Sequence, residues 1–375
     1  MTIAIDAAFD GGNIRLLAIA EERDRTRVDL EIVRDHQSDF FQWFYFRAAG
    51  LGGKPATFRI LNAGESAYPM GWPGYRTRAS TDLDTWRTID TRYEGGVLEF
   101  DWTGDTSLAW FAYFAPYTME QHARLVARTA QAPGVEHRVL GHSLDGQAID
   151  YFRIGAGAKQ VWLYARQHPG ESMAEWWMDG ALAWLTGEAA APLLAAATVH
   201  VVPNMNPDGT RRGHLRTNAA GVNLNREWHA PTVERSPEVL AVLRRMDETG
   251  VDVALDVHGD EAIAANFIAG FEGIPSFTDA HGERFLAFGR RLAAHTPDFQ
   301  TELGYARSAP GKANLSMSTN QLAERFGAVS ITLEMPFKDH DPNPDPIEAW
   351  SPARSQRLAV SCLEVVAEMI ADGAL

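Results

Sequence analysis

The stretch VWLYARQHPGES at residues 161–172 decides the fold, because it joins a strand to a helix through a short turn. Residues 161–165 form a short apolar run without charges, which is typical of a strand covered on both faces. Residues 172–185, which follow, are predicted to form a helix. A buried strand that leads into a helix is the repeating unit of α/β domains. This stretch therefore predicts an α/β fold.

The same alternation of strands and helices continues to the end of the chain. We predict further strands at residues 198–202, 251–257 and 328–333, and helices at residues 118–130, 236–249, 283–295, 316–326 and 355–370. This order predicts a mixed, mostly parallel sheet flanked by helices. We place this α/β domain at residues 119–375.

The first third of the chain has a different character. It is rich in aromatic and turn residues, and its short apolar runs at residues 40–46, 57–61 and 97–102 are bounded by Gly, Asn and Asp. Such spacing is typical of all-β domains. Nearly every side chain in residues 39–47 is bulky, so we expect a central strand covered on both faces. Residues 1–118 are therefore predicted to form a β-sandwich domain that precedes the α/β domain.

The charge balance argues against nucleic acid as a partner. The 375 residues carry 34 basic and 49 acidic side chains, which gives a net charge of −15 spread evenly along the chain. A surface that binds nucleic acid needs clustered basic residues to neutralise phosphates. We therefore expect no nucleic-acid partner.

Cysteine content and hydropathy suggest where the protein acts. The single cysteine, Cys362, cannot form an internal disulfide and lies in an apolar run, so we expect a buried, unreactive thiol. No apolar stretch approaches the ~20 residues of a membrane span, and the N-terminus lacks the features of a signal peptide. A soluble, cytoplasmic protein with no membrane partner is predicted. The oligomeric state stays open.

The turn after the first strand carries metal-binding residue types. His168 and Glu171 are three residues apart at the carboxyl end of a predicted strand, where open α/β sheets form their active sites. Ser172 and Glu175 have the spacing of a capping box, which would place both residues at the helix start. Imidazole nitrogen and carboxylate oxygen are both zinc ligands. By itself this H-x-x-E pattern is weak, because it occurs again at His258–Glu261.

A second strand end strengthens the metal interpretation. His258 directly follows the predicted strand at residues 251–257, so both histidines can reach one edge of the sheet. His168, Glu171 and His258 would bind one Zn²⁺ per chain and leave a fourth position for water, which is a catalytic pattern. The competing interpretation of His258 is a hydrogen-bonded strand-end histidine. Asp256 could orient a ligand or serve a purely structural purpose, and both interpretations stay open.

These motifs resemble those of the M14-type zinc metallocarboxypeptidases, and most closely their cytosolic carboxypeptidase branch. The resemblance rests on His168-Pro169-Gly170-Glu171 with the distant His258, and on four further segments of the α/β domain: PNMNPDG at 203–209, GHLRTN at 213–218, NLNREW at 223–228 and ITLEMPF at 331–337. FQWFYFR at 41–47 and YFAPYT at 113–118 resemble the β-domain of that branch. The resemblance spans nearly the whole chain.

The resemblance implies roles for four residues outside the ligand set. Glu334 would be the general base that takes a proton from the zinc-bound water. Arg216 would polarise the scissile carbonyl and stabilise the oxyanion. Asn225 and Arg226 would bind the terminal carboxylate of the substrate. These roles suit the residue types, since a carboxylate can shuttle protons and a guanidinium forms bidentate bonds with carboxylates.

Three features depart from the family or concern specificity. Gly170 stands where the pancreatic branch carries an arginine, so a substrate contact is lost or supplied elsewhere. The family's mobile tyrosine has no clear match, and Tyr305 is the candidate. Arg307 and Lys312 are candidates for a basic pocket that would favour acidic C-terminal residues, although surface solvation is an equal interpretation of both.

The predicted function is zinc-dependent hydrolysis of the C-terminal peptide bond of peptides or proteins, with acidic C-terminal residues as a candidate preference. The alternative is an aspartoacylase-like zinc amidohydrolase acting on N-acyl amino acids. A non-catalytic peptide-binding module is disfavoured, because such a module has no use for Glu334. Since the acidic surface would repel a substrate carboxylate, Arg216 and Arg226 must supply positive charge locally.

Overall fold

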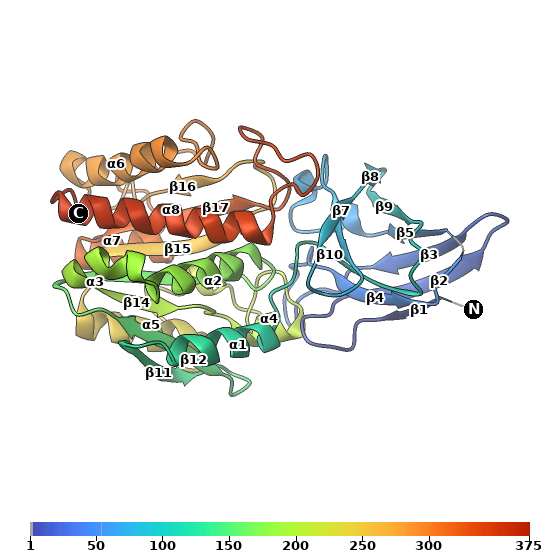
Figure 1. Cartoon of the computed structure of the whole chain (residues 1–375), viewed down its shortest axis with the longest axis horizontal. Coiled ribbons are helices and arrows are strands. Elements are labelled where there is room, and N and C mark those ends of the chain that lie inside the picture. The colour runs from blue at the N-terminus through green and yellow to red at the C-terminus, as the bar shows by residue number, and fades with distance from the viewer. Residues whose placement is uncertain (1–2, 54) are drawn as a thin grey trace.

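Three β-sheets organise the chain in the computed structural model, which describes residues 3–53 and 55–375. Two five-stranded sheets form the N-terminal part, and a seven-stranded sheet with helices forms the C-terminal part (Figure 1). The two parts lie end to end along the longest axis of the molecule. The division at residue 118 stays a prediction.

The N-terminal sheets face each other as a sandwich. The first has the strand order β1 (Ala4–Asp6), β4 (Tyr45–Ala49), β10 (Leu108–Ala112), β6 (Thr77–Ser80), β7 (Arg87–Ile89). The second has the order β2 (Arg15–Glu21), β3 (Thr26–Glu31), β5 (Ala56–Ile60), β9 (Val97–Trp102), β8 (Thr91–Glu94). Aromatic rings join them: the centroids of Phe58 and Phe111 lie 4.9 Å apart, and those of Phe46 and Phe58 lie 5.8 Å apart. The predicted sandwich is confirmed.

One predicted strand of this domain is wrong in its extent. Residues 39–47 were expected to be one central strand, but β4 begins only at Tyr45. The segment before it is buried without joining a sheet, because side chains and loops satisfy its polar groups instead. Gln42 Nε2 donates to Tyr68 O and to Tyr113 Oη, and Trp43 Nε1 donates to Gly11 O. The bulky residues therefore predicted burial correctly, but they did not predict whether the segment pairs with a neighbouring strand.

The large sheet has a parallel centre. Its strand order is β11 (Val135–His142), β12 (Ala148–Ile154), β14 (Ala197–Val202), β13 (Lys159–Ala165), β15 (Val253–Asp260), β17 (Val329–Pro336), β16 (Phe267–Ala269). The four strands from β14 to β17 run parallel, and β11, β12 and β16 pair antiparallel. The predicted mixed α/β sheet is confirmed. The β11–β12 hairpin was not predicted.

Helices cover both faces of this sheet. They are α1 (Met119–Ala130), α2 (Met173–Leu185), α3 (Ala191–Ala196), α4 (Pro207–Arg212), α5 (Pro237–Thr249), α6 (Asp279–His295), α7 (Ser318–Phe326), α8 (Pro352–Ala371), and the 3₁₀ turns η1 (Ala63–Glu65), η2 (Pro69–Gly71), η3 (Glu188–Ala190) and η4 (Leu224–Arg226). Alternate residues of β13 enter different cores: Leu163 belongs to the apolar cluster that includes residues of α2, α6 and α8, and Trp162 to the one that includes residues of α5 and α7. In Figure 1, α2 and α8 lie in front of the sheet.

The predicted capping box at the start of α2 is wrong. Ser172 has helical backbone angles, and its Oγ donates to Ala115 O at 2.9 Å instead of capping the helix. Glu175 is fully buried and bonds to other side chains. A capping box does form at α1, where Thr118 Oγ1 accepts from Gln121 N and Gln121 Oε1 accepts from Thr118 N.

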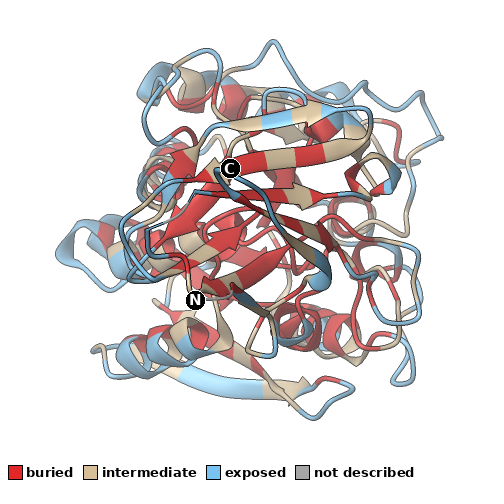
Figure 2. Ribbon diagram, turned by 90° about the vertical axis from the view of Figure 1, so that its right-hand side faces the viewer, coloured by how far each residue is buried: buried red, intermediate tan, exposed pale blue. Residues whose placement is uncertain are grey.

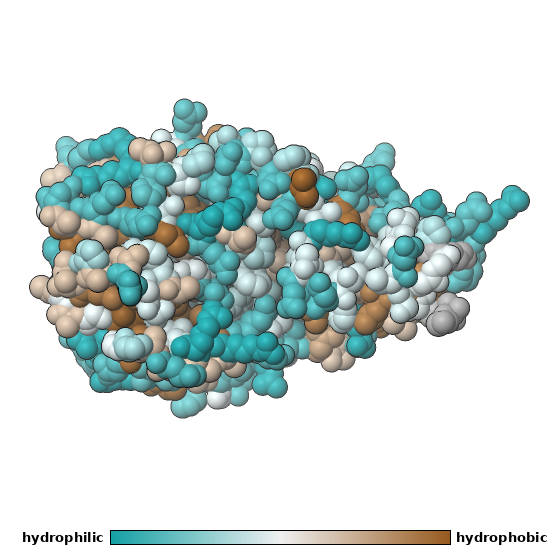
Figure 3. All heavy atoms as spheres, viewed as in Figure 1, coloured by the Kyte–Doolittle hydropathy of each residue, from teal (hydrophilic) through white to brown (hydrophobic). Residues whose placement is uncertain are grey.

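Apolar side chains are concentrated inside the molecule. Buried residues occupy the central strands, and exposed residues lie in outer loops and on the outward sides of helices (Figure 2). Hydrophilic residues predominate on the face drawn in Figure 3. Cys362 is buried, as expected. None of the helices in the described part of the chain combines the length and the apolar character that a membrane span requires.

Candidate active site

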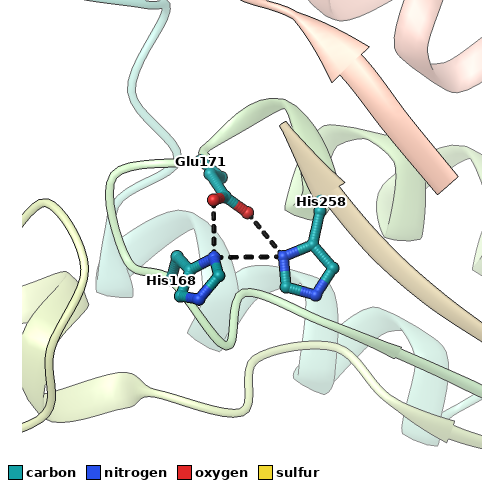
Figure 4. A group of neighbouring side chains, drawn as sticks. All are labelled: His168, Glu171 and His258. Atoms are coloured by element: carbon teal, nitrogen blue, oxygen red, sulfur yellow. Dashed lines mark hydrogen bonds and ion pairs between the residues drawn. The ribbon is translucent and has the colours of Figure 1, made fainter. Parts of the chain in front are cut away.

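His168, Glu171 and His258 converge at the carboxyl edge of the large sheet (Figure 4). His168 and Glu171 lie in the turn after β13, and His258 lies near the end of β15. Glu171 Oε1 is 2.6 Å from His168 Nδ1, and Glu171 Oε2 is 2.8 Å from His258 Nδ1. The two Nδ1 atoms are 3.2 Å apart. The structure therefore brings together the three residues predicted to bind zinc.

Neighbouring side chains fix the orientation of both imidazole rings. His168 Nε2 lies 3.1 Å from Asn223 Oδ1, and His258 Nε2 lies 2.9 Å from Asp256 Oδ1. Each ring thus uses Nε2 for a protein contact and turns Nδ1 toward the shared centre. Asp256, whose purpose was open, lies where it can orient His258. Two ring nitrogens and one carboxylate, all buried, match the donor set of a catalytic zinc site.

The charges around this centre suit a cation. Burial lowers the pKa of His168 to about 4, with Arg216 contributing, so its imidazole is neutral near pH 7. Burial would raise the pKa of Glu171, but His168 and His258 outweigh burial and lower it. For His258 burial favours a lower pKa, and the carboxylates of Asp256 and Glu171 raise it instead. The carboxylates of Glu171 and Asp256 therefore lie against the imidazoles of His168 and His258. A metal ion bound there can neutralise their negative charge.

A buried ionic network supports the metal-binding turn. Arg166, in the left-handed backbone region with a φ of 58°, donates from Nη1 to Glu175 Oε2 at 2.8 Å and from Nη2 to Pro169 O. Glu175 Oε1 lies 2.6 Å from His122 Nδ1, and His122 Nε2 lies 3.2 Å from Asp150 Oδ2. This network links the turn to α1, α2 and β12.

Gly170 is explained by close contact with another loop. Its N–H donates to Leu215 O at 2.8 Å, and a Cβ at this position would lie 2.9 Å from the same carbonyl oxygen. A side chain between His168 and Glu171 would therefore collide with backbone. The loop that carries Arg216 occupies this space.

Glu334 faces the metal centre from the next strand. It is the register partner of His258 in the parallel pair β15–β17 and is 7% exposed. Burial raises its pKa well above the usual range; His258 opposes this, and the carboxylates of Glu171, Asp260 and Glu261 add to it. Its Oε2 has no hydrogen-bond partner within residues 3–53 and 55–375. A buried carboxylate oxygen without a partner is costly unless it has a chemical task.

Tyr305 reaches the same carboxylate. Its Oη donates to Asp260 Oδ2 at 2.6 Å and lies 3.4 Å from Glu334 Oε1, although half of the residue is exposed. Asp260 in turn accepts from the backbone of Ala262 and Ile263. The structure thus places the candidate tyrosine at the mouth of the site.

Two arginines provide the positive charge of the site. Burial opposes the charge of Arg216, but Tyr68, Glu171, Glu261 and Glu334 raise its pKa. Arg226 is exposed, and burial of part of its side chain together with the charge of Arg216 lowers its pKa. The positive charge of Arg216 thus acts on Arg226, and both cations can attract an anion to the site.

Asn225 lies beside Arg226 in η4. Its Oδ1 accepts from Ser318 N at 2.9 Å, and for its Nδ2 the described residues offer no hydrogen bond. The amide is thus held in a fixed orientation with its donor group unused. This arrangement suits a carboxylate ligand.

Sequence reasoning missed several residues around the site. Asn223 lies within a segment that was singled out, but its contact with His168 could not be predicted from spacing. Tyr68 and Asp35 belong to the N-terminal domain, and no local pattern points to them. Tyr68 lies over the guanidinium of Arg216, with 5.4 Å between Cζ and the ring centroid.

Comparisons with known proteins agree with this geometry. A family model described as the cytosolic carboxypeptidase N-terminal domain matches residues 5–114, and one described as zinc carboxypeptidase matches residues 122–265. Protein ZMO1242 of Zymomonas mobilis, itself uncharacterised, is 54% identical and covers 99% of this chain and 97% of its own length. Mouse cytosolic carboxypeptidase 1 is 26% identical over a match that covers 64% of this chain and 23% of that protein.

A solved structure matches nearly the whole chain. The metallo-carboxypeptidase from Pseudomonas aeruginosa in complex with (2-guanidinoethylmercapto)succinic acid is 42% identical, with a TM-score of 0.95. The match covers 99% of this chain and 100% of that one. Both parts of the fold are therefore shared with that protein.

Proposed function

This chain belongs to the zinc carboxypeptidase family, in the branch with a cytosolic carboxypeptidase N-terminal domain, and from that membership we propose how its residues act. It is a metallocarboxypeptidase. We propose that it hydrolyses the C-terminal peptide bond of peptides or proteins. His168, Glu171 and His258 are the proposed ligands of one zinc ion per chain. When bound there, zinc supplies Lewis-acid chemistry, polarising a carbonyl and lowering the pKa of a water toward ~7.

Glu334 is the proposed general base. The observation that carries this role is its position in register with His258, with a buried Oε2 that lacks a partner in the described residues. This oxygen can accept a proton from the attacking water and later pass it to the leaving amine. The Tyr305 hydroxyl, close to Oε1, can donate to the same carboxylate or to a substrate.

Arg216, Asn225 and Arg226 are the proposed substrate-binding groups. The carboxylates of Glu171, Glu261 and Glu334 are among the charges that raise the pKa of Arg216, which supports a place for this residue in the proposed site. It is suited to stabilise the developing oxyanion. Arg226 and the free amide donor of Asn225 are suited to the terminal carboxylate.

A panel of peptides that differ in their last residue, analysed by mass spectrometry, tests the proposal. We expect the loss of one C-terminal residue, and we expect Glu334→Gln to reduce this activity by about 10²–10⁴-fold while zinc content is unchanged. Glu364→Gln is the matched control, because Glu364 lies on α8 and pairs with His295 at the end of α6, away from the proposed metal ligands. Zinc-loaded protein that cleaves none of the peptides would contradict the proposal.

The amidohydrolase alternative receives no support from the comparisons, since both matching family models are carboxypeptidase models. The same assay includes N-acyl amino acids. Turnover confined to those compounds would favour the alternative.

The proposed preference for acidic C-terminal residues rests on the positive charges of Arg307 and Lys312, both of which are exposed. Arg307 also lies 3.5 Å from Glu272 Oε1, and an exposed ion pair of this kind is weak. The peptide panel decides the preference directly. Equal rates for acidic and neutral last residues would exclude it.

A known ligand of a relative supplies a binding probe. The Pseudomonas aeruginosa protein is in complex with (2-guanidinoethylmercapto)succinic acid, a compound with two carboxylates and one guanidinium group. We propose that this compound also binds the present chain, with a carboxylate placed between Arg216 and Arg226. Calorimetric titration would measure its affinity without any turnover.

We also propose that the protein acts in the cytoplasm. The support is that relatives are named cytosolic carboxypeptidases, and that Cys362 is buried as a free thiol. Fractionation of cells that express the chain from its native gene would test this.

A further inference from the structure

The loop that carries Arg216 is bound by residues of the other domain along its whole length. Four N-terminal residues bond to it. Gly11 N donates to Arg211 O, Asn13 Nδ2 donates to Gly213 O, and His36 N donates to His214 Nε2. Asp35 accepts from the next three residues of the loop, Leu215, Arg216 and Thr217. We refer to residues 211–217 as the arginine loop. Its first residues also bond to their own domain, since Arg212 pairs with Asp145, Gly213 N donates to Thr210 O and His214 N donates to Gly209 O. From Leu215 to Thr217 one such bond is found among the described residues, that of Leu215 O, which accepts from Gly170 N.

Asp35 is the centre of this attachment. Its Oδ1 accepts from Leu215 N at 2.7 Å, and its Oδ2 accepts from Arg216 N at 2.8 Å and Thr217 N at 2.9 Å. The hydroxyl of Thr217 adds a fourth bond at 3.0 Å. Asp35 is 3% exposed, so these charge-assisted bonds are shielded from water. One carboxylate thus fixes three consecutive peptide groups around Arg216.

The guanidinium end of Arg216 meets the same domain. Its Cζ lies 5.5 Å from the ring centroid of Phe40 and 5.4 Å from that of Tyr68. Phe40 belongs to the loop of Asp35, since Asp35 N donates to Phe40 O at 2.8 Å. Tyr68 is held by Gln42, which accepts from Tyr68 N and donates to Tyr68 O. Both ends of the Arg216 side chain are therefore positioned by the β-domain.

We propose that the N-terminal domain completes the active site, with Asp35 as the positioning residue for Arg216. This inference rests on the proposed function, because it assumes that Arg216 acts on the substrate. A guanidinium aimed at developing charge must be fixed before reaction, and small misplacements of such a group reduce the rate strongly. Asp35 makes no hydrogen bond to the proposed zinc ligands or to Glu334, so its effect must pass through the arginine loop, in which Leu215 O accepts from Gly170 N and Arg216 faces the substrate.

Asp35→Asn is the main test, because it keeps the shape and places an NH₂ group against a backbone N–H. We expect kcat to fall about 10–100-fold with KM little changed, since Arg216 acts in the transition state. Zinc content should be unchanged. The matched control is Asp29→Asn, which removes a largely buried carboxylate of β3 that pairs with Arg59 in the same domain. We expect the control to keep wild-type kcat.

Two further measurements separate positioning from general damage. Hydrogen exchange of the amides of residues 215–217 should accelerate in Asp35→Asn, while exchange in the helix α2, residues 173–185, stays unchanged. In an Arg216→Ala background, Asp35→Asn should reduce kcat no further. Multiplicative losses in that double variant, or unchanged exchange of the loop amides, would overturn the proposal.

Two designs keep the test decisive. If Asp35→Asn does not fold, Thr217→Val removes only the hydroxyl bond to Asp35, and we expect a two- to tenfold loss of kcat. An unchanged kcat would count against the proposal.

If the wild type shows no peptidase activity, the proposed function fails on its own. Titration with (2-guanidinoethylmercapto)succinic acid then tests the positioning: Asp35→Asn and Arg216→Ala should both weaken binding, Arg216→Ala more strongly, and unaffected binding in Asp35→Asn would refute it.

Discussion

The metal centre and the arginine loop meet at one site but are built in different ways. His168, His258 and Glu334 all lie at the carboxyl ends of adjacent parallel strands, so the register of a single sheet places them. Arg216 lies on a loop whose backbone bonds to residues about 180 positions earlier in the chain. The difference shows that one active site can combine residues placed by a sheet with residues placed by a neighbouring domain.

The largest effect is expected at the metal centre. His258→Ala removes one of the three proposed zinc ligands, so we expect loss of the bound zinc and complete loss of activity. Metal analysis of the purified protein should give about one zinc per chain for the wild type and far less for the variant. Hydrogen exchange of residues 215–217 should not change, because the arginine loop is held elsewhere. A variant that keeps zinc and activity would contradict the assignment of His258.

Arg216→Ala should impair catalysis without affecting the proposed zinc site. We expect kcat to fall by about 10²–10³-fold, as for the loss of one group that stabilises an oxyanion, while zinc content stays at the wild-type value. Steady-state kinetics and metal analysis measure both. Arg212→Ala is the control in the same loop, since Arg212 pairs with Asp145 on the surface. If the control lost as much activity as Arg216→Ala, the assignment of Arg216 would be wrong.

Asp256→Asn should weaken the metal centre without removing it. Asp256 contacts His258 Nε2, and loss of such an outer partner typically costs about 10–100-fold in metal affinity. Competition with a chelator measures this affinity. Asp252→Asn, just before the same strand, serves as control because its carboxylate binds Gln160 N. Equal zinc affinity in both variants would show that Asp256 is purely structural.

The smallest effect concerns the ionic network beneath the metal-binding turn. Burial lowers the pKa of His122, but Glu175 and Asp150 outweigh burial and raise it to about 9. Because the folded pKa exceeds the unfolded value near 6.5, this histidine stabilises the fold below about pH 6.5, and the contribution is lost as pH rises through 9. We expect the free energy of unfolding to fall by about 2 kcal/mol between pH 7 and 9.

Denaturant unfolding at several pH values measures this dependence. His122→Gln should show a flatter profile over the same window, because the group that titrates is absent. A profile as steep as that of the wild type would assign the change to other groups. The arginine loop, which is held by hydrogen bonds to Asp35, should show no matching pH dependence in its hydrogen exchange.

The sequence predicted that His168, Glu171 and His258 would lie together, because strand ends are a local property. An apolar strand followed by His168, and another followed by His258, could be recognised without knowing how the strands pair. The family resemblance then pointed to Glu334, and the β15–β17 register places it beside His258. Tyr305 was a candidate without a clear match, and its contact with Glu334 depends on a loop path that no periodicity predicts.

Other expectations failed where distant partners outweigh local pattern. Ser172 and Glu175 had capping-box spacing, but Ala115, Arg166 and His122 recruit them into contacts between elements. The aromatic run before β4 suggested a strand, yet its backbone follows a loop that supports Tyr68 and the arginine loop. Asp35 could not be predicted at all, because nothing in its own neighbourhood marks it as a ligand of a loop in the other domain.

The attachment of the arginine loop also bears on the order in which the protein takes shape during synthesis. Gly11, Asn13 and Asp35 leave the ribosome long before Arg216 is made, with 180–200 residues between the partners. Domains generally fold as units, N-terminal first. The β-domain can therefore be complete when residues 211–217 emerge, and the nascent loop then meets a finished template that dictates its conformation.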